Sequence, residues 1–123
     1  MRKFYSFSLL MLLSMTLCGI VAVAQTVTVD NIVYNVYTHL GEANLTNGKS
    51  ATGNVVIPAE VEYEGKKYPV CNIGTSSFEN NTAITSVELP ASVTEIYSEA
   101  FSGCTNLVSI TCGAETLNYI VFP

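Results

Sequence analysis

The chain has 123 residues, of which 49% are hydrophobic and 12% are charged, and its formal net charge is −5. This length and composition predict one small folded domain and argue against a disordered chain. Ten acidic residues outnumber five basic ones, which argues against a surface for nucleic-acid binding.

Residues 1–24 have the pattern of a secretory signal peptide. Arg2 and Lys3 supply a positive start, and an apolar run follows from Leu9 to Val21. The tripeptide Ala22-Val23-Ala24 then gives the small residues that a signal peptidase requires. The run is shorter than the ~20 residues of a membrane span, so a cleaved signal is preferred to a retained anchor.

Cleavage is expected before Gln25. Cys18 could suggest a lipoprotein, but Leu17 precedes it where a small residue is needed. The chain from Gln25 keeps three lysines against ten acidic residues, a net charge of −7. We therefore expect an acidic protein that is secreted or displayed on the cell surface, with no membrane span after cleavage.

Residues 25–52 predict an antiparallel β cap. The segment Ile32–Tyr37 alternates in polarity and predicts a strand, with Tyr34 on the core face and Tyr37 on the other. Ala43–Thr46 is a weaker strand candidate. Such a cap would cover the open end of the structure that follows.

The next segment predicts a β-hairpin, because Tyr63 and Tyr68 flank a turn that contains glycine. Glu60, Glu62 and Glu64 alternate before this turn. They could hold calcium from one face of the strand, or they could form a charged, solvent-facing edge that resists aggregation. The second interpretation is preferred.

From residue 73 the sequence repeats with an offset of 23. Ile73 aligns with Ile96 and Phe78 with Phe101. Further pairs at this offset are Thr82 with Thr105, Ile84 with Leu107, Ser86 with Ser109, Val87 with Ile110, and Leu89 with Cys112. The period lies within the ~20–29 residues of leucine-rich repeats.

Each repeat predicts a one-sided strand followed by a return segment. In Ile84–Leu89 the apolar residues lie on one face, and Pro90 ends the strand. We expect Ser98–Phe101 to form a single helical turn that buries its phenylalanine. The aligned residues Asn81 and Cys104 are expected to hydrogen-bond the backbone at a tight inward turn.

The segments Ile84–Ile96 and Ala100–Leu107 resemble the BspA-type leucine-rich repeat, and the resemblance extends over about residues 53–121. It implies a mainly β fold: a short solenoid of parallel strands with one helical turn per repeat, in which residues 53–123 hold about two repeats. Proteins of this family are typically exported to the bacterial surface, and some act as adhesins. The resemblance offers no catalytic residues to transfer.

The C-terminal end of the sequence matches the repeat only in part. Leu117 and Ile120 align with Val93 and Ile96 if one residue is inserted, and no capping element follows. An uncovered final strand could pair with another chain.

The sequence offers no catalytic constellation. His39 is the single histidine and Asp30 the single aspartate, and neither stands in a known catalytic motif. We therefore expect no enzyme, no cofactor and no metal site.

After signal cleavage three cysteines remain, an odd number for an exported chain. Cys71 aligns with an outward-facing position and is predicted to be the most reactive thiol. Cys104 and Cys112 could form a disulfide, although small buried apolar side chains are the simpler interpretation.

The predicted function is protein binding by the strand-bearing face, in the manner of an adhesin. The expected contact residues are Thr85, Ser86, Glu88, Ser109 and Thr111, with Tyr97 as an exposed aromatic contact. The partner would be a protein of a host or neighbouring cell, or else a glycan. Two alternatives remain: a structural fragment that docks edge-on to another repeat protein or to itself, and an accessory binding module of a longer enzyme.

Overall fold

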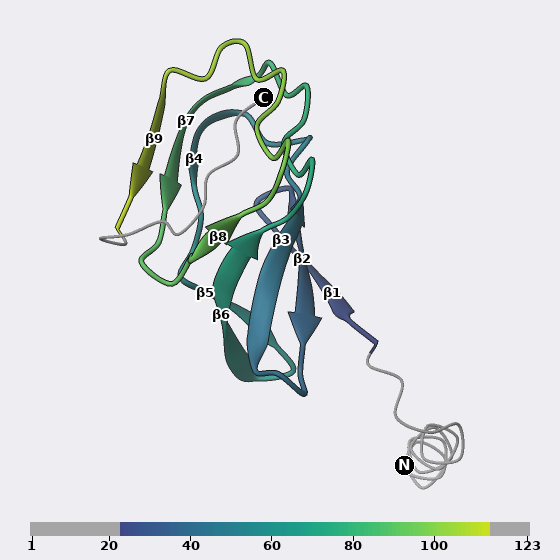
Figure 1. Cartoon of the computed structure of the whole chain (residues 1–123). Helices are drawn as coiled ribbons and strands as arrows, with labels where there is room; N and C mark the ends of the chain where they lie inside the picture. The colour runs from purple at the N-terminus through teal and green to yellow at the C-terminus, as the bar shows by residue number, and fades with distance from the viewer. Residues whose placement is uncertain (1–22, 114–123) are drawn as a thin grey trace, which may run out of the picture.

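The computed structural model describes residues 23–113, so most of the predicted signal peptide and the partial repeat around Leu117 and Ile120 lie outside the described residues. The described residues form strands joined by turns (Figure 1). In chain order these are β1 (Gln25–Val29), β2 (Ile32–Tyr37), β3 (Glu42–Asn47), β4 (Gly53–Val56), β5 (Glu60–Tyr63), β6 (Lys66–Ile73), β7 (Ile84–Leu89), β8 (Glu95–Ile96) and β9 (Ser109–Cys112). The predicted mainly β class is confirmed.

The strands form two sheets that share one hydrophobic core. The first has the order β1-β2-β3-β6-β5, with β8 also paired to β6, and the second is the parallel sheet β4-β7-β9. In Figure 1 the second sheet lies on the left and the first lies below and to its right. The core contains Leu45 and Ile73 from the first sheet together with Val55 and Val87 from the second.

The N-terminal strands are antiparallel, as the sequence predicts. Asp30 and Asn31 have φ values of 50° and 65°, the left-handed pair that a tight two-residue hairpin requires. Tyr34 and Val36 of β2 are fully buried, whereas Tyr37 is half-buried on the other face. The strands predicted at 32–37 and 43–46 are confirmed, and β1 is an additional strand that the sequence analysis missed.

The predicted hairpin between Tyr63 and Tyr68 is confirmed. Strands β5 and β6 are antiparallel, and Tyr63 pairs with Lys66 across the turn. Glu64 and Gly65 occupy this turn with φ values of 49° and 76°. The second half of β6 connects this hairpin to the repeats. It pairs with β3 on one edge and with β8 on the other.

The 23-residue register appears as strand pairing in both sheets. Ile73 pairs with Ile96 between β6 and β8, and Val87 pairs with Ile110 between β7 and β9. Parallel pairing puts chemically similar side chains side by side, so each apolar position of one repeat covers the same position of the previous one. This confirms the repeat inferred from the sequence.

The expected helical turn at Ser98–Phe101 is wrong, because the described residues contain no helix. Glu99 has a φ of 59°, and Ser76, its equivalent one repeat earlier, has a φ of 57°. A left-handed residue interrupts a right-handed helical turn. The segment forms successive turns instead, with Ser102 N donating to Glu99 O at 3.1 Å. Phe101 is nevertheless buried, as predicted.

The aligned residues Asn81 and Cys104 make the expected backbone contacts. Asn81 is 5% exposed, and its Nδ2 donates to the carbonyl oxygens of Gly48 and Ala51, both at 2.9 Å. The Sγ of Cys104 donates to the carbonyl oxygen of Phe78 at 3.0 Å. Both side chains thus connect a turn to the backbone of the preceding coil.

Candidate binding face

The parallel sheet β4-β7-β9 presents two rows of side chains away from the core. One row contains Asn54, Ser86 and Ser109, and the other contains Val56, Glu88 and Thr111. Their neighbours along each strand, which include Val55 and Val87, point into the core. We call these two rows, with Thr85 and Val108 beside them, the strand face.

The strand face brings together five of the six residues that the sequence predicts. Ser86 and Glu88 lie on β7, and Ser109 and Thr111 lie beside them on β9. Thr85 is exposed at a register shift, where Ile84 pairs with Gly53 but Ser86 pairs with the next residue, Asn54.

Tyr97 lies apart from the other five. It follows β8, and its backbone N–H donates to Ile73 O at 2.9 Å, which places it beside β6 in the first sheet. Its side chain is 43% exposed. A hydrogen bond with Glu95 and the charge of that carboxylate raise the pKa of Tyr97.

The sequence analysis missed the contribution of β4. Asn54 and Val56 extend the two rows by a third strand, and Val56 is 59% exposed. The available signal was the similarity of Ile57-Pro58-Ala59 to Leu89-Pro90-Ala91, because the same 32-residue offset aligns Asn54 with Ser86 and Val56 with Glu88.

Glu88 is the single ionisable residue among the eight of the strand face, a share similar to the 12% of charged residues in the whole chain. The Oγ of Ser86 donates to Oδ1 of Asn54, so two polar side chains of one row contact each other. Val108 adds an aliphatic side chain that is 85% exposed. The face therefore combines small polar groups with exposed valines.

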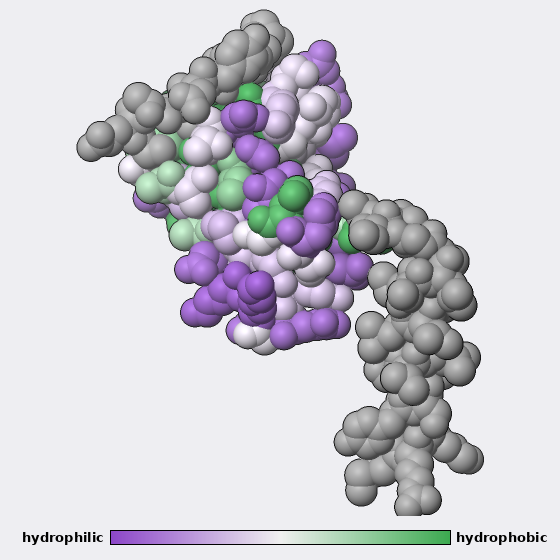
Figure 2. Space-filling model, turned by 60° about the horizontal axis from the view of Figure 1, so that its bottom comes forward, coloured by the Kyte–Doolittle hydropathy of each residue, from purple (hydrophilic) through white to green (hydrophobic). Residues whose placement is uncertain are grey.

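Figure 2 shows one side of the molecule coloured by hydropathy. Apolar atoms lie there in small patches among polar ones. The large hydrophobic side chains that are exposed in the described residues are Val23, Leu40, Val56, Tyr97 and Val108. A contact on this molecule would therefore combine apolar and polar groups.

The candidate catalytic residues are separated by the fold. Asp30 lies in the turn before β2 and His39 in the turn after it, and both are exposed. The His39 ring packs edge-on against Tyr37 with centroids 6.3 Å apart. Asp30 and His39 therefore lie at opposite ends of β2 and do not form a catalytic pair.

The three glutamates of the hairpin, Glu60, Glu62 and Glu64, are exposed. Glu62 stands opposite Lys67 in the hairpin. Within residues 23–113 no three His, Cys, Asp or Glu side chains are grouped as metal ligands.

Two of the cysteines are free thiols, Cys71 and Cys104, so a disulfide between Cys104 and Cys112 does not form. Burial and the nearby Glu42 carboxylate raise the pKa of Cys71. A raised pKa lowers the fraction of thiolate at neutral pH, which opposes the expectation that Cys71 is reactive. Burial also raises the pKa of Cys104.

The repeated apolar positions, paired at a spacing of 23 residues, define a leucine-rich-repeat protein. Residues 71–121 match the family described as the BspA type leucine rich repeat region, a model of six copies, and this part of the chain belongs to that family. No curated protein matches the chain.

Solved bacterial structures share the fold. A leucine-rich repeat protein from Bacteroides capillosus is 35% identical, with a TM-score of 0.64 over 71% of this chain and 64% of that one. A leucine rich cell surface protein from Faecalibacterium prausnitzii is 32% identical, with a TM-score of 0.64 over 72% of this chain and 24% of that one. The T. pallidum leucine rich repeat protein is 28% identical, with a TM-score of 0.57 over 71% and 39%.

This chain therefore spans less than two thirds of each of these relatives. BspA-type repeat proteins are typically bacterial surface or secreted proteins, and leucine-rich repeats typically bind proteins and are generally not enzymes. Among residues 23–113 there is no helix of the length and hydropathy needed to cross a membrane.

Proposed function

We propose that the protein is an exported, non-enzymatic binding module that holds a protein partner on the strand face. The observation that carries the proposal is the pair of exposed valines, Val56 and Val108, among the small polar side chains of this three-strand face. Its two rows offer one carboxylate, Glu88, among small polar side chains and the exposed valine Val56. Exposed apolar side chains rimmed by polar ones are typical of surfaces that bind proteins.

The shape of the face favours a macromolecular partner. Three parallel strands place equivalent side chains about 4.8 Å apart across the sheet. The rows that start at Asn54 and at Val56 therefore form a regular surface. A surface of this kind suits a partner with an extended surface of its own, whereas small ligands require a concave site.

A protein partner is preferred to a glycan. The rows contain no aromatic side chain, and Tyr97 lies beside the other sheet, so no ring on these strands can stack on a sugar. The exposed Val56 and Val108 instead offer aliphatic area that a protein surface can cover. We place this partner on a host or neighbouring cell.

Export is the second part of the proposal. It is supported by the signal-peptide pattern of residues 1–24 and by the typical location of the family. The test is the intact mass of the product in the medium, the envelope and the cytoplasm of the native cells. A product that begins at Gln25 supports export with cleavage, whereas a cytoplasmic product that retains Met1 contradicts it.

The binding role is tested by cell adhesion of protein-coated beads. Ser109→Arg with Thr111→Arg adds two charges to the strand face on β9. The matched control is Thr26→Arg with Thr28→Arg, which adds the same charges to two exposed positions of β1.

The beads are mixed with epithelial cells and with neighbouring bacteria, before and after protease treatment of those cells. We expect the β9 variant to lose about tenfold or more in adhesion, as for charges introduced at an interface centre. The β1 variant and wild type should bind alike, and protease should abolish their binding. Equal binding by both variants contradicts the assignment of the face, and resistance to protease with sensitivity to glycosidase indicates a glycan instead.

A further inference from the structure

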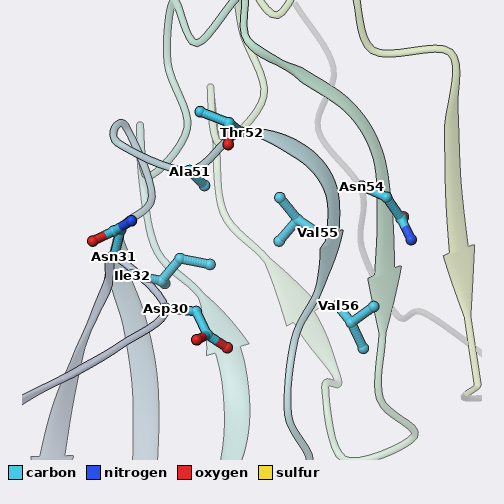
Figure 3. A pocket seen from close by; sticks show the side chains of 8 residues that line it. All are labelled: Asp30, Asn31, Ile32, Ala51, Thr52, Asn54, Val55 and Val56. Atoms are coloured by element: carbon cyan, nitrogen blue, oxygen red, sulfur yellow. The ribbon is translucent and has the colours of Figure 1, made fainter.

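A groove lies beside β4, on the edge that does not face β7 (Figure 3). Its volume is about 430 Å³, within the range of ligand-binding sites. The floor is formed by Ile32, Ala51 and Val55, which are 3%, 4% and 5% exposed. In Figure 3 the side chains of Ile32 and Val55 point toward each other across it. The rim includes Asp30 and Val56.

The backbone of β4 is available along this groove. The N–H groups of Gly53 and Ile57 donate to Ala83 O and Glu88 O on the β7 side, both at 2.9 Å. Because peptide groups alternate in direction along a parallel strand, those of Asn54 and Val56 point to the opposite edge. No strand among residues 23–113 pairs with that edge, since β4 is the terminal strand of its sheet.

Asp30 gives the groove a negative charge that no ion pair among residues 23–113 involves. It is the single ionisable residue among those that line the groove. The one ion pair of the described residues joins Lys49 to Glu79, at 3.9 Å, and does not involve Asp30. In Figure 3 Asp30 lies on the β1–β2 turn, across the groove from Val55 and Val56 of β4.

We propose that this groove binds an extended, basic peptide segment of a partner protein. The segment adds a strand to the free edge of β4, with hydrogen bonds to the peptide groups of Asn54 and Val56. A lysine or arginine of the segment reaches Asp30, and its aliphatic stem lies over Ile32 and Val55. Backbone pairing supplies affinity, and the carboxylate selects the charge.

Charge favours such a partner over a second copy of this chain. The chain from Gln25 carries a net charge of −7, so two copies repel each other. The strand that would pair, Gly53–Val56, contains no lysine or arginine to reach the Asp30 of another copy. The groove is also distinct from the strand face, because the side chains of its floor belong to the hydrophobic core. The two surfaces share only Asn54 and Val56.

The test measures peptide binding to the protein as its cells produce it, by fluorescence anisotropy. The probe is a labelled, acetylated hexapeptide of sequence Thr-Val-Thr-Lys-Thr-Val. One control peptide has glutamate in place of lysine. Two further control peptides carry N-methyl groups on alternate amides, one peptide for each alternate set. Each N-methylated set blocks strand pairing along one edge of the peptide.

The informative variant is Asp30→Asn, because asparagine tolerates the left-handed φ of 50° at this position and should preserve the turn. Its control is Glu60→Gln, which removes one carboxylate from β5, outside the groove. Far-UV circular dichroism of each variant verifies that it is folded.

We expect the lysine peptide to bind about tenfold more tightly than the glutamate peptide, and Asp30→Asn to reduce this ratio below about threefold. Glu60→Gln should leave the ratio unchanged, and of the two N-methylated peptides only the one whose methylated amides face β4 should lose binding. The proposal is overturned if no peptide binds, if both charges bind equally to wild type, or if the protein self-associates through β4 and thereby blocks the peptide. Asp30 lies outside the strand face, so these outcomes are independent of the β9 adhesion test.

Discussion

The rings of Phe78 and Phe101, residues separated by one repeat, stack with centroids 5.1 Å apart and an interplanar angle of 9°. Their backbones are joined as well, since Phe78 N donates to Ala100 O at 2.8 Å. Successive repeats therefore contact each other at this position through a ring stack and through a backbone hydrogen bond. Stability should depend on this stack.

Truncation of Phe78 should destabilise the protein more than truncation of Phe101. Phe78 is fully buried, whereas Phe101 is 8% exposed. We expect Phe78→Ala to lower the free energy of unfolding by about 3–5 kcal/mol and Phe101→Ala by less. Urea unfolding followed by circular dichroism measures both, with Phe78→Leu as the milder variant if Phe78→Ala does not fold. A larger loss for Phe101→Ala would contradict this order.

Gly48 should tolerate no side chain, because a Cβ there would overlap the ring of Phe78. That ring cannot move freely, since it is buried and stacked. We expect Gly48→Ala to cost about 1–3 kcal/mol of unfolding free energy. In the double variant Gly48→Ala with Phe78→Leu the loss should be smaller than the sum of the single losses. Additive losses would show that the two residues do not compete for space.

Asn81 should be needed for its hydrogen bonds. Its Oδ1 accepts from the backbone N–H of Ala83 and Ile84, at 2.9 Å and 3.2 Å, and its Nδ2 satisfies two carbonyl groups. Asn81→Ala leaves these groups without a partner and should cost about 2–4 kcal/mol. The exposed Asn106, which donates to Thr82 O, is the control, and Asn106→Ala should cost less than about 1 kcal/mol. Equal losses in urea unfolding would refute the special role of Asn81.

Removal of the Tyr34 hydroxyl should stabilise the protein. The hydroxyl is buried and makes no hydrogen bond, and burial raises the pKa of Tyr34. Tyr34→Phe retains the ring and should raise the free energy of unfolding by up to about 1 kcal/mol. Tyr37→Phe on the half-buried face should have little effect. A clear loss of stability in Tyr34→Phe would mean that the hydroxyl contributes to folding.

Stability should fall in alkaline solution. Burial raises the pKa of the Cys71 and Cys104 thiols above their ordinary value of 9.0, so the folded state favours the protonated form. The contribution is fully present below pH 9.0 and decreases as the pH rises through the folded-state pKa values. Urea unfolding under reducing conditions at pH 7 and pH 10 measures the loss. The variant Cys71→Ala with Cys104→Ala should lose less over this range, and an unchanged loss would point to other groups.

The strand positions were largely predictable from the sequence. Alternation at Ile32–Tyr37 and the glycine turn between Tyr63 and Tyr68 are local signals, and the repeat of Ile73 at Ile96 reports shared core positions. The left-handed backbone of Glu99 was not predictable, because its aligned residue is Ser76 and neither residue type signals a positive φ. The helical turn was therefore wrongly expected.

The composition of the strand face was predictable for β7 and β9 and not for β4. The spacing changes from 23 to 32 residues where the β5–β6 hairpin is inserted, so Val56 falls outside the register that aligns Glu88 with Thr111. Tyr97 is exposed, as predicted, but its position relative to the other five residues was not predictable from the sequence. The chain turns after each strand, and a residue that follows β8 belongs to the first sheet.

The most direct test of the claim that the strand face binds a protein partner is photo-cross-linking at the cell surface. A photoreactive phenylalanine analogue is placed at Thr111 in one variant and at Thr28 of β1 in another, both exposed strand positions. After adhesion to cells and irradiation, the account predicts a cross-linked adduct of discrete, protease-sensitive mass from position 111 and none from position 28. An adduct from position 28 alone, or from neither position while adhesion persists, would contradict it.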